Sequence, residues 1–339
     1  MGVLRMAENI RIEKDQKIIK ILAAQVRNER VDSNLTNDVD SVVHALAEEN
    51  SDANRTALGQ IMAYTIDETQ QKALDWMNIF ADVRNVALGD RPMYRIPTKG
   101  IKAFIQATGS TTARTKVTDR QFSLNTFEIS SRPAVDVWDI RMNRINMADL
   151  IRQANDQFTL LKLKHVEKVL QNGIQVYGSP WYATGVNPGD GIVKPTFDTQ
   201  LKHFKRLGNV VIFGDAIEDL AVLSGMPASA NFTQFSGSQI DEFNNNGYLG
   251  RYNGCSLVKM QNAYDDDGVT PILNVDWLYI MVAGTSKDQM NLKVLNEGPV
   301  YSMTSQNIDD HTLETELTQR FGAGFVVGSV PSMGAYEVI

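Results

Sequence analysis

The chain has 339 residues, of which 43% are apolar and 22% are charged, and its net charge is −7. This length allows two or three compact units, and the composition is ordinary for a globular protein. No apolar run approaches the roughly 20 residues of a membrane span. The single cysteine, Cys255, excludes an internal disulfide and fits a reducing compartment. The acidic net charge gives no overall nucleic-acid signature.

The N-terminal region is predicted to be helical and acidic. Helical patterns cover Asp15–Arg30, Asp38–Glu49 and Asp52–Phe80, and Val31–Asn37 is a polar break. From Val31 to Asp82 there are ten acidic residues and two basic ones, Arg55 and Lys72, which gives a charge balance of −8. The acids are Asp32, Asp38, Asp40, Glu48, Glu49, Asp52, Asp67, Glu68, Asp75 and Asp82.

A long polar hairpin is predicted next. Its arms are Met93–Gln106 and Thr115–Phe127, and the small, polar link between them turns at Gly109. The arms carry too little apolar surface to fold on themselves, and an isolated two-stranded hairpin is marginal in water. The pattern therefore predicts that the hairpin lies on another surface, and a neighbouring copy of the chain is the surface we expect.

The charge of Pro92–Thr126 is opposite to that of the preceding helices. Only Asp119 offsets six bases, a balance of +5. Two interpretations stay open: two solvated faces of opposite sign, or a basic hairpin that meets an acidic surface on the next subunit. The six bases are Arg95, Lys99, Lys102, Arg114, Lys116 and Arg120.

A strand over Phe127–Ile140 and one long helix over Asn146–Asn172 follow the hairpin. Asn146 is a good N-cap, Asp149 complements the helix N-terminus, and Gly173 is expected to end the helix. A helix of about 25 residues is roughly 37 Å long. Taken alone, it would pass for an ordinary amphipathic core helix.

The remaining residues predict an irregular crossing, Ile174–Thr196, and then a mixed α/β unit. Helices are expected over Asp198–Leu207 and Asp215–Leu223, with a polar loop region over Gly225–Asn246. The expected strands are Asn209–Phe213, Cys255–Met260, Trp277–Val282, two long strands Leu292–Met303 and Thr312–Phe321 around a polar tip Thr304–Asp310, then Phe325–Val330 after a turn at Gly322–Gly324, and Ala335–Val338.

Signals for catalysis are poor. The four histidines lie far apart without metal-like spacing, and Asp265–Gly268 lacks the other ligands of a calcium loop. There is no phosphate-binding loop, dinucleotide fingerprint or nucleophile elbow, and Asp215 after a strand is at least as well explained as an N-cap. We therefore predict no enzyme activity, no catalytic or cofactor-binding residue, and no metal.

The order of these elements resembles the major capsid proteins of tailed bacteriophages, which have the Hong Kong 97-type fold. Phe127–Val135 leads to Ile145–Ile151 much as that family runs from its extended loop to its spine helix. Leu249–Val258 looks like a strand entry of the family's axial domain, and Glu314–Ala323 looks like its late strand and turn. The resemblance covers nearly the whole chain.

The resemblance implies an α+β capsid fold of four parts. They are an N-terminal arm with helices (1–91), an extended loop (92–126), a peripheral domain with the spine helix (127–175 and 297–331) and an axial domain (176–296 and 332–339). The implied function is self-assembly into pentamers and hexamers of an icosahedral shell that encloses packaged phage DNA. The six bases of the loop would then contact the adjacent subunit.

The same resemblance implies partners and a location. We expect a separate scaffolding protein, a portal at one vertex, double-stranded DNA held without sequence-specific binding, and no membrane. We also expect the mature subunit to keep most of its N-terminus. The protein would be made in the cytoplasm of the host bacterium and would end in the virion capsid.

Some relatives of that fold carry a covalent crosslink between subunits. Here it would join Lys99, Lys102 or Lys116 to Asn307 with help from Glu314, although such residues are common in basic loops and turns. Two other functions stay open: an encapsulin-like protein nanocompartment shell, and a cytoplasmic α/β enzyme with its catalytic domain over residues 176–296. The content of the particles, DNA or protein cargo, would distinguish a phage capsid from the nanocompartment shell. The size of the assembled particle would distinguish a capsid protein from the enzyme.

Overall fold

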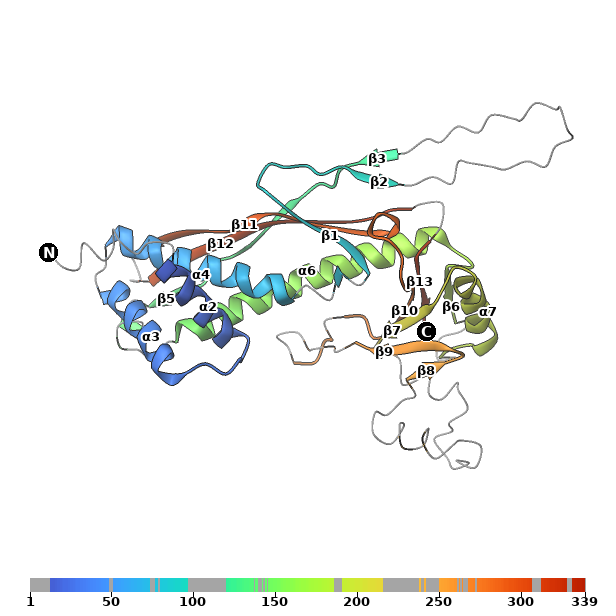
Figure 1. Ribbon diagram of the computed structural model, residues 1–339, viewed down its shortest axis with the longest axis horizontal. Coiled ribbons are helices and arrows are strands. Elements are labelled where there is room, and N and C mark those ends of the chain that lie inside the picture. Colours follow the sequence, from blue (N-terminus) through green and yellow to red (C-terminus); the bar gives the residue numbers. More distant parts are fainter. Residues whose placement is uncertain are drawn as a thin grey trace, which may run out of the picture.

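One long helix organises an elongated, mixed α and β molecule (Figure 1). Helix α6, Met147–Tyr177, runs along most of its length, with a long sheet beside it, three helices at one end and a second sheet at the other. The computed structural model describes residues 13–48, 51–73, 77–78, 80–96, 120–136, 138–139, 142, 144, 146–185, 191–215, 238, 241, 250–260, 262, 264, 268–271, 273–306, 312–327 and 331–338.

The long sheet has the strand order β1-β11-β12-β4, and β5 also pairs with β12. In β12 every second residue from Leu313 to Phe321 is buried, which is the period expected of a sheet with one covered face. Helices α4 and α6 cover that face. The strands are β1 (Ala81–Val86), β4 (Phe127–Ser131), β5 (Ala134–Asp136), β11 (Leu292–Gln306) and β12 (Thr312–Phe325).

Three N-terminal helices pack beside the first half of α6: α2 (Glu13–Val26), α3 (Ser33–Glu48) and α4 (Asp52–Ala73). Arg152 of α6 donates hydrogen bonds to the carbonyls of Gln25 and Val26, at 3.1 and 3.3 Å, and so satisfies the open end of α2. Helix α3 begins within the predicted polar break because the carboxylate of Asp32 accepts the Asn34 N–H at 3.0 Å.

The second sheet has the order β6-β13-β10-β7-β9-β8 and divides two cores. All six residues of β10 are buried; Trp277, Tyr279 and Met281 join the core around α6, while the alternate residues pack against α7 on the other face. The elements are β6 (Tyr182–Thr184), α7 (Lys194–Lys205), β7 (Val210–Gly214), β8 (Arg251–Tyr252), β9 (Cys255–Lys259), β10 (Trp277–Val282) and β13 (Met333–Glu337).

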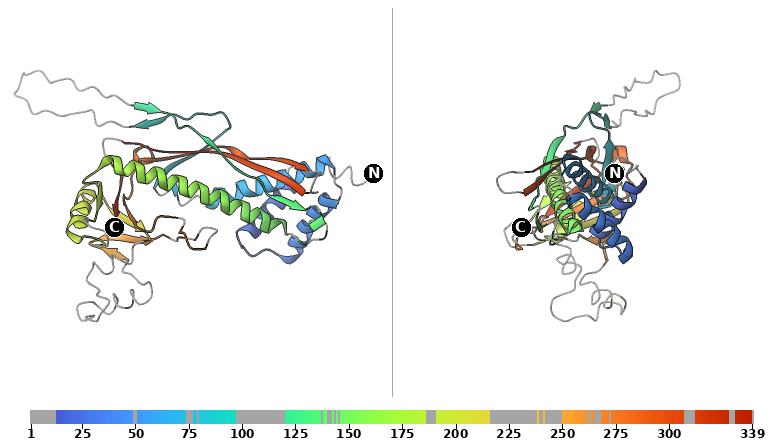
Figure 2. Two further views of the ribbon diagram at one scale, coloured as in Figure 1. Left: turned by 180° about the vertical axis from the view of Figure 1, so that it is seen from behind. Right: turned by 90° about the vertical axis from the view of Figure 1, so that its left-hand side faces the viewer.

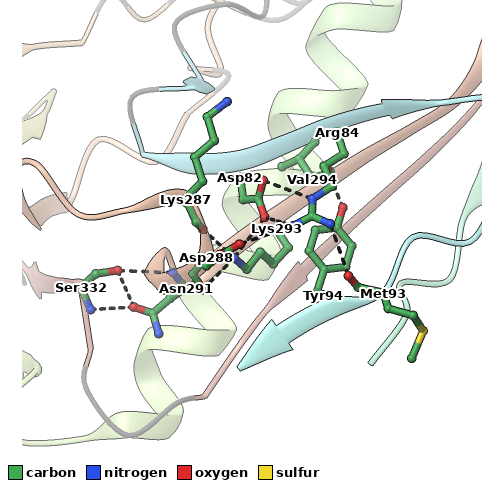
Figure 3. Close-up of polar contacts among 10 residues, drawn as sticks. All are labelled: Asp82, Arg84, Met93, Tyr94, Lys287, Asp288, Asn291, Lys293, Val294 and Ser332. Atoms are coloured by element: carbon green, nitrogen blue, oxygen red, sulfur yellow. Dashed lines mark hydrogen bonds and ion pairs between the residues drawn. The ribbon is translucent and has the colours of Figure 1, made fainter. Parts of the chain in front are cut away.

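Asn291 joins the chain segments that cross between the two sheets (Figure 3). Its side-chain oxygen accepts hydrogen bonds from the N–H and the hydroxyl of Ser332, both at 2.6 Å. Its side-chain nitrogen donates to the hydroxyl of Tyr177 and the carbonyl of Val326, both at 2.8 Å. The last residue of α6 is therefore tied to both crossings.

Most predicted elements are confirmed, but several boundaries are wrong. The spine helix does begin after the N-cap Asn146, which accepts the Ala148 N–H at 2.8 Å. It does not end at Gly173; it continues to Tyr177 and ends at Gly178, whose φ is +61°. Gly173 is buried inside the helix because the Phe325 ring lies against it, where a Cβ atom would be 2.2 Å from the ring.

The predicted strand Phe127–Ile140 is two short strands, β4 and β5, interrupted at Arg132 and Pro133 because proline cannot donate to a ladder. The predicted turn at Gly322–Gly324 is also wrong, since β12 continues to Phe325. At Gly322 a Cβ atom would lie 2.7 Å from the Asn125 carbonyl oxygen, so glycine allows a close approach of two chain segments instead of a turn.

The helix predicted over Asp52–Phe80 ends at Ala73, and Ala81–Val86, which the sequence left without an assignment, forms β1. The strands predicted at Asn209–Phe213, Cys255–Met260, Trp277–Val282 and Ala335–Val338 are present to within a few residues. Apart from Asp215, the residues of the predicted helix Asp215–Leu223 lie outside the described residues, as do most of the loop Gly225–Asn246 and the tip residues 307–310.

Replacing Gly173 with alanine should destabilise the protein, because the new methyl group meets the Phe325 ring and overpacking typically costs about 1–3 kcal/mol. This exceeds the gain of up to about 1 kcal/mol from better helix propensity. Denaturant unfolding of G173A measures the difference. The exposed neighbour Asn172→Ala is the control and should be neutral or slightly stabilising; a G173A variant that matches it would contradict the packing account.

Candidate assembly site at the root of the hairpin

The hairpin predicted from sequence begins where β2 (Tyr94–Ile96) pairs antiparallel with β3 (Arg120–Phe122). Tyr94 lies opposite Phe122, and Ile96 lies opposite Arg120. The pair stands off the layers formed by α6 and the long sheet (Figure 2). Of the predicted contact residues, Arg95 and Arg120 are exposed on these strands. Lys99, Lys102, Arg114 and Lys116 lie outside the described residues.

Tyr94 anchors the hairpin to the long sheet. Its side chain is fully buried, and its hydroxyl donates a hydrogen bond to the Val294 carbonyl at 3.2 Å. Its ring stacks on Phe122 with 5.6 Å between centroids, so both arms of the hairpin share the anchor. Leu124 and Leu295 complete this small apolar cluster. Burial, and after it the neighbouring Asp82 carboxylate, raises the pKa of Tyr94 to about 12, which keeps the hydroxyl a donor.

A buried ion pair lies beside this tyrosine (Figure 3). Lys293 of β11 places its Nζ atom 3.2 Å from the Asp82 carboxylate of β1, and these side chains are 1% and 3% exposed. The same Nζ donates to the carbonyls of Lys287, at 2.7 Å, and Asp288, at 3.2 Å. Burial lowers the pKa of Lys293, and the Asp82 carboxylate opposes this shift. The ammonium is therefore held by three oxygens, as a buried charge requires.

Arg84 connects the ion pair to the hairpin. Its guanidinium lies 3.0 Å from the Asp82 carboxylate and 4.4 Å from the centre of the Tyr94 ring, a cation–π contact. It also donates to the Met93 carbonyl at 3.3 Å, directly before β2. Bonding to Asp82 raises the pKa of Arg84, so the side chain stays charged. The entry of the hairpin is thus fixed to β1 by one arginine.

Glu297 holds both ends of the hairpin from β11. Its carboxylate accepts the Gly89 N–H at 2.9 Å, on the segment before the hairpin, and the Thr126 hydroxyl, on the segment after it. Arg320 of β12 lies 3.6 Å away and also pairs with Glu128. The bonds from Thr126 and Gly89 lower the pKa of Glu297. One buried carboxylate therefore clasps two segments that are far apart in sequence.

The sequence analysis missed these root residues. The signal was Lys293 among the apolar residues at the start of β11, with Glu297 four residues later, together with the aspartate and arginine of Ala81–Val86. Charged residues in a strand that is buried need partners, so each cluster predicts the other. We did not expect Ala81–Val86 to be a strand, and the pairing could not be seen without it.

The acidic region from Val31 to Asp82 is less acidic at the surface than its sequence balance suggests. Asp82 is buried in the ion pair, and Asp52 lies 3.1 Å from Arg55. Of the proposed crosslink residues, Glu314 is on β12 and pairs with Arg132. Asn307 and the three lysines lie outside the described residues.

The chemistry of the root is that of a structural anchor for the hairpin. Its charged groups are paired with each other and with backbone carbonyls. Among the described residues, no group of three or more His, Cys, Asp or Glu side chains could hold a metal ion. No described helix has the length and apolar character needed to cross a membrane.

The sequence from residue 5 to residue 337 matches the model of the family described as "SPbeta prophage-derived putative capsid protein YonB". The chain belongs to this family of phage capsid proteins. No curated protein matches it in sequence.

The fold of this capsid protein is that of solved phage capsids. It is similar to the subunit of the bacteriophage PhiM1 mature capsid, with a TM-score of 0.51, 11% identity and coverage of 76% of this chain and 85% of that one. It is also similar to the capsid of an empty GTA particle, with a TM-score of 0.51, 10% identity and coverage of 77% and 88%. These likenesses establish the tailed-phage capsid fold, which the sequence resemblance predicted.

Replacing Asp82 with asparagine should destabilise the capsid protein by about 3–5 kcal/mol, because Lys293 would be left buried without a counter-charge. Denaturant unfolding of the full chain measures the loss. The matched control is Asp139→Asn, which removes the carboxylate of the exposed Arg144–Asp139 pair and should change stability by less than about 1 kcal/mol. Equal effects of the two variants would contradict the role given to the buried pair.

The clasp at Glu297 should depend on pH. Because the folded pKa of Glu297 is lower than the ordinary 4.5, its stabilising effect is fully present above pH 4.5 and is lost as pH falls through the lower folded value. Hydrogen exchange of residues 87–90 and 123–126 should therefore accelerate, relative to the intrinsic rate, as pH falls below the ordinary 4.5 and through the lower folded value. Glu297→Gln should show the faster exchange already at pH 7 and lose this pH dependence, and an unchanged pH profile would count against the clasp.

Proposed function

We propose that this capsid protein assembles into pentamers and hexamers of an icosahedral shell around packaged phage DNA. The observation that supports this most is the family match over residues 5–337, joined to a fold shared with tailed-phage capsids. The proposed role is structural and requires no cofactor. Its partners would be a separate scaffolding protein and a portal at one vertex, and the DNA would be held without sequence-specific contacts.

We further propose the division of labour within the subunit. The sheet around β11 and β12, with α6, would form the peripheral domain (127–175 and 297–331). The sheet around β10 would belong to the axial domain (176–296 and 332–339), which meets other copies at the symmetry axes. Residues 92–126 would be the extended loop that overlaps the adjacent subunit, and residues 1–91 the N-terminal arm and its helices.

The charge of the extended loop supports a contact between subunits. Its six bases would meet acidic surface on the neighbour, while its root is fixed to its own subunit through Tyr94, Arg84 and Glu297. Each exposed ion pair would contribute only about 0–1 kcal/mol. Repeated across a whole shell, such pairs would affect the rate of assembly and its sensitivity to salt.

Replacing Lys99, Lys102, Arg114 and Lys116 with glutamate should leave the subunit folded but slow or block shell formation. Analytical ultracentrifugation and negative-stain electron microscopy, at low and moderate salt, measure the assembled fraction. A matched control replaces four bases outside the loop, Lys17, Lys20, Lys202 and Lys287, with glutamate. Normal assembly of the loop variant would refute the charge-matching contact.

The composition of the particles tests the function itself. Expressed with its scaffolding protein, the chain should form closed particles of megadalton mass, and particles from infected cells should contain double-stranded DNA. Particles that hold protein cargo and no DNA would instead indicate an encapsulin-like compartment. A discrete small oligomer that never assembles would contradict the shell proposal.

A further inference from the structure

Lys162 is a fully buried amine at the junction of three elements. It projects from the middle of α6, and its side chain is 0% exposed. Its Nζ atom donates hydrogen bonds to the side-chain oxygens of Gln70, on α4, and Gln319, on β12, both at 2.5 Å. The Phe321 ring lies 5.5 Å away. No carboxylate is within hydrogen-bond distance of this nitrogen among the described residues, unlike the buried Lys293 with its partner Asp82.

A polar cavity of 280 Å³ adjoins this amine. It lies between α4, α6 and the strands β1, β11 and β12. Two buried polar atoms have no protein partner in the described part of the chain, the side-chain nitrogen of Gln70 and the side-chain oxygen of Asn296, and both residues line the cavity. Such atoms and such a volume suit several water molecules. The junction has the space and the polar atoms to take up water, and such water would give protons a route to Lys162.

We propose that Lys162 is a protonation-controlled latch that seats the spine helix α6 against α4 and β12. In its neutral form the amine bonds the two glutamine oxygens without burying a charge. When it binds a proton, a cation lies between the layers, and the junction loosens towards the hydrated cavity. The latch would make the seating of the spine helix sensitive to pH, independently of whether the proposed shell forms.

The charged groups around the latch are few. Among the residues that line the cavity, Lys162 and Asp67 of α4 are the ones that ionise; those contributed by β1, β11 and β12 are neutral. The Asp67 carboxylate accepts the Val300 N–H, and both burial and the nearby Glu68 raise its pKa. On α6 itself, His165 packs 6.1 Å from the Phe321 ring, and burial, aided by Lys168, lowers its pKa.

The working range of the latch follows from burial. Burial lowers the pKa of Lys162 from 10.5 to about 7, and the attraction of Asp67 opposes the shift. Between these values the unfolded or open state binds more protons than the closed state. Closing is therefore favoured as pH rises from 7 towards 10.5, and this advantage is lost as pH falls to 7. One proton corresponds to a change of up to about tenfold in the closing equilibrium per pH unit.

Hydrogen exchange of the full chain tests the latch. Peptides that cover residues 159–166 should become better protected, after correction for the intrinsic rate, by up to about tenfold per pH unit between pH 7.5 and 9.5. Lys162→Met, which cannot titrate, should abolish this slope. Lys168→Met, an exposed substitution on the same helix, should keep it. A wild-type slope that survives in K162M, or a wild-type protein with no slope, would overturn the proposal.

A second variant keeps the test sharp if K162M does not fold. Asp67→Asn removes a carboxylate that favours the charged amine, so the pH dependence should move to lower pH in this variant. An unchanged or upward-shifted midpoint in D67N would contradict the latch. Because the readout is local protection and not assembly, its failure is distinguishable from failure of the proposed capsid function.

Discussion

The ion pair between Asp82 and Lys293 is the constraint on which the root of the hairpin depends. It joins β1 to β11 in a parallel pairing, which has no tight turn to hold it in register. Around it, Arg84 reaches the entry of the hairpin, and Tyr94 fills the space between the strands and both arms. A buried ion pair adds little net stability by itself, but it penalises every arrangement in which one partner lacks the other. This penalty favours the one register of β1 against β11 in which Asp82 lies beside Lys293.

Strand β10 and helix α6, at the centre of the molecule, are each packed against other elements on more than one side. Strand β10 sends alternate side chains into the core around α6 and into the core under α7, so the second sheet cannot move without disturbing both. Helix α6 likewise contacts the N-terminal helices, the long sheet and, through Tyr279 and Glu167, the second sheet, where the tyrosine hydroxyl donates to the carboxylate at 3.0 Å. One helix of about 46 Å thus links all the layers.

Local chemistry made part of this architecture predictable. The apolar run Trp277–Val282 predicted a strand, and Asn146 predicted the start of α6, because each signal lies within a few residues. Gly173 misled the analysis since its small size serves a contact with Phe325, far away in sequence. The root residues could not be found for the same reason: Asp82 and Lys293 look like ordinary surface charges until β1 and β11 are paired.

The clasp at Glu297 has a mechanical consequence. A segment whose two ends are fixed at neighbouring points behaves as a cantilever, so a force applied far from the root acts with a long moment arm on the few bonds that hold it. Here those bonds include the ones from Gly89 and Thr126 to one carboxylate on β11, beside the bonds made by Arg84 and Tyr94. A pull on the segment between Gly89 and Thr126 would therefore load the long sheet at β11, one of its inner strands.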